Sequence, residues 1–273
     1  MEDTLKDGDI VLVNRMAYGA KLPKDLYEIP LLNLLTIFNN NYLNGLNWGY
    51  YRLPGFSYIQ SNDIIIFESP FIIGEGKLLV KRVVGLPSDT IQIVNNEVII
   101  NHKKTENPPN VTFDYEIINR DVRDIMNYLP ELNVKDVNHM NMIKPFAHVL
   151  RFNEEQRLKI NQNMGDSTIE KLYHPASKLC EYSPLVIPQK GKRIYFKNHL
   201  DVYLKVLTYE GVDAYIISER IMRDGKELAS YIFANDYFFV IGDNRHGSND
   251  SREWGLISEQ NVVGKIWCVL ISN

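Results

Sequence analysis

Three segments of the chain carry residue types and spacings that could do chemistry. Lys81 lies inside the apolar run LLVKRVV, which is typical of a β-strand. A string of glycine, acidic, basic and hydroxyl residues, IGDNRHGSNDSREWG, occupies 241–255, and the chain opens with MEDTLKDGDIVLV. Each segment also has an ordinary interpretation by itself. The lysine could point to solvent from an edge strand, and the string at 241–255 could be a polar turn with Asp and Asn caps.

Lys81 is the residue with the most distinctive chemistry. A lysine acts as a general base only when its amine is neutral, but its reference pKa is about 10.4. Burial among apolar side chains disfavours the ammonium form, and catalytic lysines reach pKa values of about 7–8 in this way. The neighbouring Leu78, Leu79, Val80 and Val83 can provide such surroundings. Lys81 is therefore a candidate general base.

In this order, the three segments resemble the signature boxes of bacterial type I signal peptidases, which use a serine–lysine dyad. The boxes of that family read S-M-x-P-T-L, G-D-I-V-x-V, K-R-V-V-G-x-P-G-D and G-D-N-R-x-x-S-x-D-S-R-x-x-G. The matching stretches here are 1–5, 8–13, 81–89 and 242–255. The resemblance covers both ends of the chain, and its last box is long and complete.

The resemblance implies a role for each residue of these boxes. Lys81 would take the proton from a serine hydroxyl, and the serine would attack the scissile carbonyl to form an acyl-enzyme. Ser248 would hydrogen-bond the lysine amine and orient it. The residues expected to brace the site are Arg82, Gly242, Asp243, Asn244, Arg245, Asp250, Ser251 and Arg252. The positions that match the walls of two substrate pockets are Met1, Leu5, Val11, Leu79 and Val80, although Leu5 and Val11 could equally be core residues.

The nucleophile is where the chain departs from the family pattern. In the family, the catalytic serine directly precedes the methionine that aligns with Met1, the first residue here. Asp3 and Ser88 also replace the usual proline and glycine. We therefore expect Met1–Asn273 to be inactive as given. Either the sequence starts just after the serine, with a membrane anchor upstream, or the protein is a degenerate homologue that binds exported peptides or membrane partners.

The expected partners also follow from the resemblance. They are the signal peptides of exported preproteins, cut after small residues, and the surface of the bacterial inner membrane, with the catalytic part on the periplasmic side. Segments 31–38 and 48–56 carry aromatic and aliphatic residues that could lie at a lipid interface, with packing on the core as the alternative. No metal or other cofactor is implied, because a serine–lysine dyad needs none and the six histidines show no ligand spacing.

Composition excludes several other classes of protein. The 273 residues include 30 Lys and Arg against 34 Asp and Glu, and this near-balance offers no basic face for nucleic acid. A related self-cleaving repressor is disfavoured, because it would also need a DNA-binding domain and an internal Ala-Gly site. Two cysteines, Cys180 and Cys268, exclude a disulfide scaffold. No leader pattern opens the chain and no apolar run nears the roughly 18 residues that span a bilayer, so we expect a soluble polypeptide.

Mainly β-strands should position the candidate residues. Short apolar runs between turn residues predict strands at 9–15, 63–69, 78–84, 90–101 (a hairpin turning at Asn95-Asn96), 237–243 and 262–271. Their close spacing without a βαβ rhythm predicts antiparallel sheets. The expected fold is mainly β: an antiparallel catalytic core at 1–102 and 236–273, with an insertion at about 22–58, and an inserted, mixed α+β second domain at 103–235.

The inserted domain is expected to contain both helices and strands. Helix-like stretches occur at 121–129, 153–163 and 167–174, the last with Ser167 and Glu170 spaced as in a capping box. Strand-like stretches occur at 193–196, 202–208 and 214–217.

Overall fold

Antiparallel strands dominate the part of the chain that the structure describes. The computed structural model describes residues 4–6, 8–23, 49–69, 78–117, 122–128, 149–165, 169–171 and 181–272. Every pairing between its strands is antiparallel. The predicted mainly β fold class is confirmed.

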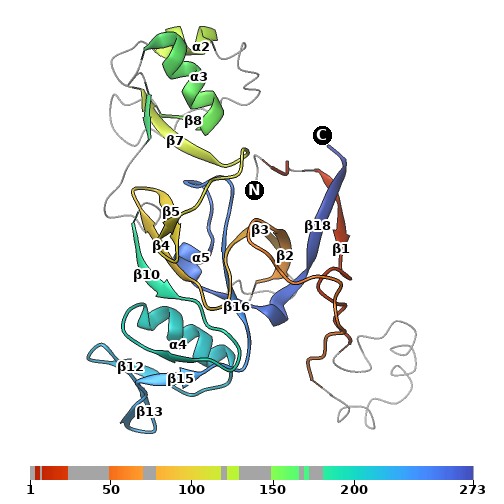
Figure 1. Ribbon diagram of the computed structural model, residues 1–273, viewed down its shortest axis with the longest axis vertical. Coiled ribbons are helices and arrows are strands. Elements are labelled where there is room, and N and C mark those ends of the chain that lie inside the picture. Colours follow the sequence, from red (N-terminus) through yellow and green to blue (C-terminus); the bar gives the residue numbers. More distant parts are fainter. Residues whose placement is uncertain are drawn as a thin grey trace.

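A six-stranded sheet joins both ends of the chain, in the order β1-β18-β2-β3-β16-β17. Its strands are β1 (Ile10–Asn14), β2 (Ile64–Glu68), β3 (Leu78–Gly85), β16 (Tyr237–Ile241), β17 (Ile257–Ser258) and β18 (Val262–Ile271). Figure 1 shows red β1 and blue β18 lying side by side, although they come from opposite ends of the chain. The sheet also makes neighbours of β3 and β16, which lead into the two main candidate motifs.

β16 is buried on both faces, which explains its uninterrupted apolar sequence YFFVI. Phe239 and Ile241 belong to one hydrophobic cluster, and Phe238 and Val240 belong to a second. Successive side chains of a strand point to opposite faces, so β16 separates the two clusters and contributes to both. β3 does the same with Val83 and Val84. Apolar packing on two sides therefore holds the pair of strands that carries the candidate motifs.

A four-stranded sheet, β10-β4-β5-β6, packs on the first cluster. Its strands are β4 (Thr90–Val94), β5 (Glu97–Ile100), β6 (Lys103–Lys104) and β10 (Tyr182–Val186). The predicted hairpin is confirmed, since Asn95 and Asn96 join β4 to β5 and both have positive φ. β10 pairs with β4, so this sheet combines residues from both sides of the predicted limit at residues 102 and 103. The domain limits themselves stay a prediction.

Helix α4 (Leu200–Tyr209) shows that the predicted strand at 202–208 is wrong. Its buried residues, Val202, Tyr203, Val206 and Leu207, lie three or four positions apart, on one face of a helix. Their β-branched and aromatic types favoured a strand, but the helical spacing matches the core. Short strands complete this region: β11 (Arg193–Tyr195), β12 (Tyr215–Ile217), β13 (Arg220–Arg223), β14 (Lys226–Glu227) and β15 (Ser230–Ile232).

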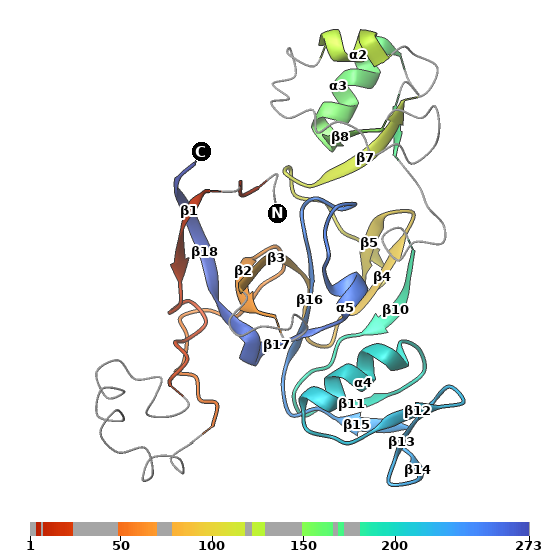
Figure 2. The same ribbon diagram turned by 180° about the vertical axis from the view of Figure 1, so that it is seen from behind.

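A third group of elements has a hydrophobic cluster of its own. It comprises β7 (Thr112–Ile117), α2 (Val122–Tyr128), β8 (Val149–Asn153), α3 (Glu154–Met164) and β9 (Ile169–Lys171). Figure 1 and, from behind, Figure 2 both show this group at one end of the molecule and α4 with β12 and β13 at the other.

Three helices were predicted in this group from the sequence, and the structure confirms two of them. The helices predicted at 121–129 and 153–163 are confirmed as α2 and α3. The helix predicted at 167–174 is wrong where the structure describes it, because Ile169–Lys171 pairs with β7 as a strand. The capping box instead starts α3, where Asn153 and Gln156 exchange side-chain and backbone hydrogen bonds. Ser167 lies outside the described residues.

The predicted insertion at about 22–58 is described only at its two ends. The backbones of Lys21 and Arg52 form an antiparallel bridge that brings these ends together. Residues 24–48, including the apolar stretch 31–38, lie outside the described part of the chain. Within that described part, no helix combines the length and the apolar character needed to cross a membrane.

Candidate active site

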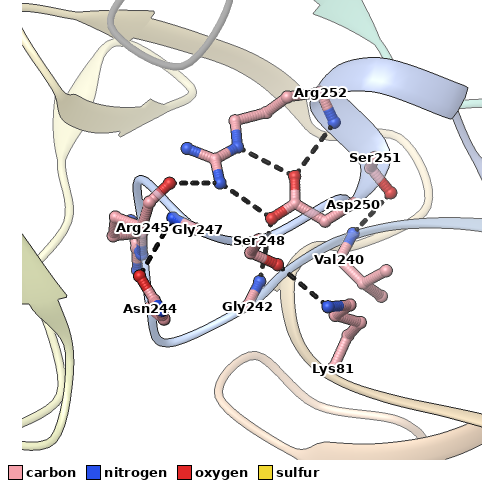
Figure 3. Close-up of polar contacts among 10 residues, drawn as sticks. All are labelled: Lys81, Val240, Gly242, Asn244, Arg245, Gly247, Ser248, Asp250, Ser251 and Arg252. Carbon is pink, nitrogen blue, oxygen red and sulfur yellow. Dashed lines mark hydrogen bonds and ion pairs between the residues drawn. The ribbon is translucent and has the colours of Figure 1, made fainter. Parts of the chain in front are cut away.

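The structure brings Lys81 and Ser248 into contact, although they are 167 positions apart in the chain. Lys81 lies on β3, and its Nζ donates a hydrogen bond of 2.9 Å to Oγ of Ser248. Figure 3 shows this contact at the lower right of the site. Lys81 is half-buried and Ser248 is buried. A hydroxyl group thus occupies one side of the lysine amine within a largely enclosed site.

Gly242, directly after β16, leaves the space that this contact needs. A Cβ atom at position 242 would lie 2.1 Å from Oγ and 2.6 Å from Cβ of Ser248, and 3.4 Å from Nζ of Lys81. The first two distances are far inside van der Waals contact. Glycine is therefore required at position 242 because the Ser248 side chain packs closely against the backbone there, and not because the backbone has an unusual conformation.

The carboxylate of Asp250 organises the segment that carries Ser248. Its Oδ1 and Oδ2 accept hydrogen bonds of 2.8 Å from Nε and Nη2 of Arg252, so the ion pair is bidentate. Oδ2 also accepts a hydrogen bond of 3.0 Å from the backbone N–H of Gly242. The Ser248 hydroxyl hydrogen-bonds the same carboxylate. Asp250 therefore holds both the serine and the glycine against which the serine packs.

Asp250 is completely buried, and Arg252 is nearly so. Burial by itself raises the pKa of the Asp250 carboxyl, but the charge of Arg252 and the hydrogen bonds from Arg252, Gly242 and Ser248 outweigh it. The pKa consequently lies below its ordinary value. Asp250 also caps the short helix α5 (Ser251–Trp254) by accepting a hydrogen bond from the backbone N–H of Arg252. The carboxylate is ionised at neutral pH.

Further hydrogen bonds close the 242–252 segment on itself and on β16, as Figure 3 shows. They run from Nη2 of Arg252 to the carbonyl of Arg245 (2.7 Å), from the N–H of Gly247 to Oδ1 of Asn244 (3.0 Å), and from the N–H of Val240 to Oγ of Ser251 (3.0 Å). These contacts shape the loop, as predicted for the bracing residues Asn244, Arg245, Ser251 and Arg252. The residue of this segment that hydrogen-bonds the Lys81 amine is Ser248.

Arg82 forms the second buried ion pair of the site. Its Nε and Nη2 donate hydrogen bonds of 2.8 and 2.7 Å to the two carboxylate oxygens of Asp243, and its Nη1 donates to the carbonyl of Asn62 over 2.9 Å. The Thr4 hydroxyl donates to the same carboxylate. Burial raises the pKa of Asp243, but the bonds from Arg82 and Thr4 more than offset it and lower the pKa. This pair ties the N-terminal segment to β3.

Two contributors to the site carried little or no signal in the sequence. Thr4 belongs to the matched stretch 1–5, but the resemblance assigned it no role. Its hydroxyl hydrogen-bonds Asp243, and the presence of a hydroxyl at this motif position was the only sign of that bond in the sequence. Thr112, at the start of β7, receives a backbone hydrogen bond of 3.0 Å from Arg245 and donates one of 2.9 Å to Asp243. These bonds join the site to the third group of elements, and nothing in the local sequence of Thr112 indicates them.

The residues predicted as pocket walls are dispersed around β1 and β3. Leu5, Val11, Leu79 and Val80 are all half-buried, and Met1 lies outside the described residues. Leu79 packs on the second hydrophobic cluster, and alternation along β3 gives it the same face as Lys81. Val80 then points to the opposite face. The assignment of these residues to substrate pockets stays a prediction.

The described part of the chain contains no group of three or more His, Cys, Asp or Glu side chains that could hold a metal ion. Cys268, on β18, has a free and exposed thiol. Cys180 lies outside the described residues.

The crowding at Gly242 yields a double-mutant test. Gly242→Ala should lower the free energy of unfolding by about 1–3 kcal/mol, because the new methyl group overpacks against Ser248. Ser248→Gly removes the atoms that the methyl group meets. The double variant should therefore lose less free energy of unfolding than the two single variants lose together. Urea denaturation of the four proteins measures this coupling. Strictly additive losses would mean that Ser248 is not what restricts position 242.

Breaking the Asp250–Arg252 pair should be costly. Asp250→Ala should lower the free energy of unfolding by about 3–5 kcal/mol, because it leaves the buried Arg252 charge without its partner. Asp224→Ala is the matched control, since the Arg223–Asp224 pair lies at the surface and should contribute about 0–1 kcal/mol. Chemical denaturation of both variants provides the comparison. Similar small losses would contradict the structural role of Asp250.

The lowered pKa values of Asp243 and Asp250 predict a loss of stability in acid. A depressed pKa in the folded state stabilises the protein above the ordinary value of 3.8, and this contribution is lost as the pH falls through the folded value. Denaturation midpoints should therefore fall steeply below about pH 4. Asp250→Asn should show a shallower fall over that range. An identical pH profile in the variant would exclude Asp250 as a source of the acid sensitivity.

Comparisons with known proteins point to one family. Two relatives named Signal peptidase I, from Buchnera aphidicola subspecies Baizongia pistaciae and Schizaphis graminum, are 26% and 25% identical to the chain. The alignments cover 99% and 98% of this chain but 67% and 64% of the relatives, so the chain spans about two thirds of their length. A signal peptidase I from Helicobacter pylori strain J99 is 34% identical over 89 residues, 31% of each chain.

A solved structure of a signal peptidase I from Enterococcus faecalis V583 is 18% identical, covering 77% of this chain and 98% of that chain with a TM-score of 0.30. The family model described as "Signal peptidase, peptidase S26" matches residues 1–271, almost the whole chain. The chain belongs to the signal peptidase family, peptidase S26.

Proposed function

We propose that this chain forms the catalytic part of a serine endopeptidase that removes signal peptides from exported preproteins, with Lys81 as the general base. The observation that carries this proposal is the 2.9 Å contact between Nζ of Lys81 and Oγ of Ser248. Family membership and relatives named Signal peptidase I support the reaction class and the type of substrate.

The direction of the hydrogen bonds around Ser248 supports a base role for Lys81. The Asp250 carboxylate can only accept, so the Ser248 hydroxyl donates its proton to Asp250 and accepts from the lysine. An N–H of Lys81 is thereby committed to Ser248. When the amine is neutral, it also has a lone pair, which can accept the proton of a second hydroxyl. Ser248 is therefore a positioning residue, and the nucleophile is a different serine.

The family motif assigns that nucleophile to the residue directly before the methionine that aligns with Met1. Thr4, in the same motif, hydrogen-bonds Asp243, whose partner Arg82 follows Lys81 directly in β3. This anchor supports an arrangement in which the start of the motif lies near the amine. Lys81 would take the proton of the serine hydroxyl as the serine oxygen attacks the scissile carbonyl. The C–N bond would then break, the leaving amine would take the proton back from Lys81, and water, with Lys81 again as base, would hydrolyse the acyl-enzyme.

The substrate would bind beside the base through small side chains that precede the scissile bond. Met1, Leu5, Val11, Leu79 and Val80 are the positions that the family resemblance assigns to the pocket walls. Their half-buried state, for the four that are described, is consistent with shallow apolar pockets.

We also propose that the protein works against the lipid surface of the bacterial inner membrane, on its periplasmic side. Exposed apolar side chains on β1 and β18 support this, among them Trp267, which is 71% exposed. In the predicted lipid-facing segment 48–56, Phe56 is 85% and Tyr51 is 57% exposed. Aromatic side chains of this kind favour the interface between lipid and water.

The test of the proposal adds a serine directly before Met1 as the nucleophile. A chain extended upstream so that a serine directly precedes Met1 should cleave a signal-peptide substrate, whereas Met1–Asn273 should not. Lys81→Met in the extended chain should reduce turnover by a factor of about 10²–10⁴ or more, because methionine matches the lysine stem but cannot act as a base. Ser248→Ala should cost less, since it removes only an orienting hydrogen bond.

Lys226→Met, at an exposed position on β14, is the control and should retain full turnover. Mass spectrometry of the products gives the cleavage site and the rate. Equal activity with methionine at position 81 would overturn the role of Lys81 as base. A folded, serine-extended chain that binds the peptide without cleaving it would instead favour the alternative function, a non-catalytic homologue that binds exported peptides.

A further inference from the structure

A cavity of about 320 Å³ lies on the side of β3 opposite Lys81. Val84 contributes to its wall, and residues three apart on a strand point to opposite faces, so the cavity does not open onto the lysine amine. Its polar lining consists of Ser61, Asn62, Thr105, Glu106, Asn107 and the side chain of Arg245. Among these residues, only Arg245 is cationic.

Arg245 is unusual among the arginines of the site. The residue is only 5% exposed, and its Nε has no hydrogen-bond partner within the described residues. Its guanidinium carbon lies 5.8 Å from the centre of the Phe113 ring, a weak cation–π contact. Arg82 and Arg252, in contrast, each form a bidentate pair with a carboxylate. A buried N–H donor without an acceptor is costly, because its hydration has been lost without replacement, and this applies to Nε of Arg245.

The charges around Arg245 do not balance. Three buried guanidinium groups, of Arg82, Arg245 and Arg252, face two buried carboxylates, of Asp243 and Asp250. Both carboxylates are already engaged by the other two arginines, which leaves Arg245 without a buried carboxylate as its partner. Burial and the nearby positive charge of Arg252 lower the pKa of Arg245 to about 10. At neutral pH the guanidinium is therefore still charged, although its surroundings oppose that charge.

We propose that this cavity binds a small oxyanion, a phosphate or carboxylate group, which pairs with the guanidinium of Arg245. A guanidinium presents N–H donors in a planar fork that matches such groups. The hydroxyl of Ser61 and the side-chain amides of Asn62 and Asn107 can supply further donors around the same space. Glu106, at the exposed rim of the cavity, carries a negative charge that opposes the binding of an anion there.

The bound anion would also affect the candidate active site. The carbonyl of Arg245 accepts a hydrogen bond from Arg252, and its N–H donates to Thr112. An oxyanion that fixes the Arg245 side chain would thus stabilise the 242–252 segment, which holds Ser248 against Lys81. The inference concerns a site separate from the proposed peptidase chemistry and does not require that chemistry to be correct.

The test is a titration of the full chain with inorganic phosphate at constant pH and ionic strength. The side-chain Nε–Hε resonance of Arg245 should shift with saturation, and the melting temperature should rise along the same binding curve. Arg245→Gln should abolish the saturable rise. Arg220→Gln, which removes an arginine whose side chain is 64% exposed, should keep it.

Phosphate also stabilises many proteins without binding, because it is excluded from their surfaces. A rise that does not saturate, or one that Arg245→Gln retains, would show that free phosphate does not bind this site, and would overturn the proposal unless a lipid phosphate binds there in the experiment below. Glu106→Gln provides a second variant in case Arg245→Gln does not fold. It removes the opposing charge at the rim and should tighten phosphate binding severalfold. Unchanged or weaker binding in Glu106→Gln would count against this cavity as the site.

A parallel experiment distinguishes a free anion from a lipid headgroup. The Arg245 resonance is followed during addition of phosphatidylcholine vesicles with and without phosphatidylglycerol. A response to phosphatidylglycerol but not to free phosphate would support the oxyanion site with a lipid phosphate as its occupant. A resonance that responds to neither probe would overturn the proposal.

Discussion

The bidentate ion pair between Asp250 and Arg252 is the interaction on which the arrangement of the candidate site depends. Because Asp250 is ionised and buried, it must satisfy its oxygens with donors from several directions, and those donors include Gly242 and Ser248. One carboxylate thereby joins the end of β16, the hydroxyl next to Lys81 and the start of α5. A neutral residue at this position could not hold the three together, since it could not accept as many hydrogen bonds.

The position of the lysine depends on a second constraint, the packing of β3 and β16 between two hydrophobic clusters. A slip of one residue in β3 would exchange its faces and take Lys81 and Arg82 away from Ser248 and Asp243, so these contacts hold the register. Lys81 and Arg82 are consequently held on opposite sides of one strand. The first contacts Ser248, and the second pairs with Asp243 and anchors Thr4. Lys81 and Arg82 have different roles, although they are adjacent in sequence, because successive side chains of a strand point to opposite faces.

The sequence by itself determined the fold class, most of the core strands and the identity of most of the residues that meet at the site. Short apolar runs between turn residues and Asn95-Asn96 predicted strands and a hairpin correctly, since these signals depend on nearby residues alone. Lys81 and Ser248 were predictable partners only through the resemblance of whole motifs. Local patterns misled at 202–208, where β-branched residues form the buried face of a helix, and at 169–171, where residues predicted as helix form a strand.

Only the tertiary structure decided which charges pair and which do not. Three arginines and two aspartates of the matched motifs are buried, and nothing in their spacing shows that Arg245 is the one without a carboxylate. That outcome depends on burial and on the directions of side chains from β3 and the 242–252 segment. Thr112 likewise joins the site through backbone groups alone, which every residue type possesses. Long-range pairing of this kind leaves no local pattern in a sequence, because its energy is realised only when distant segments meet.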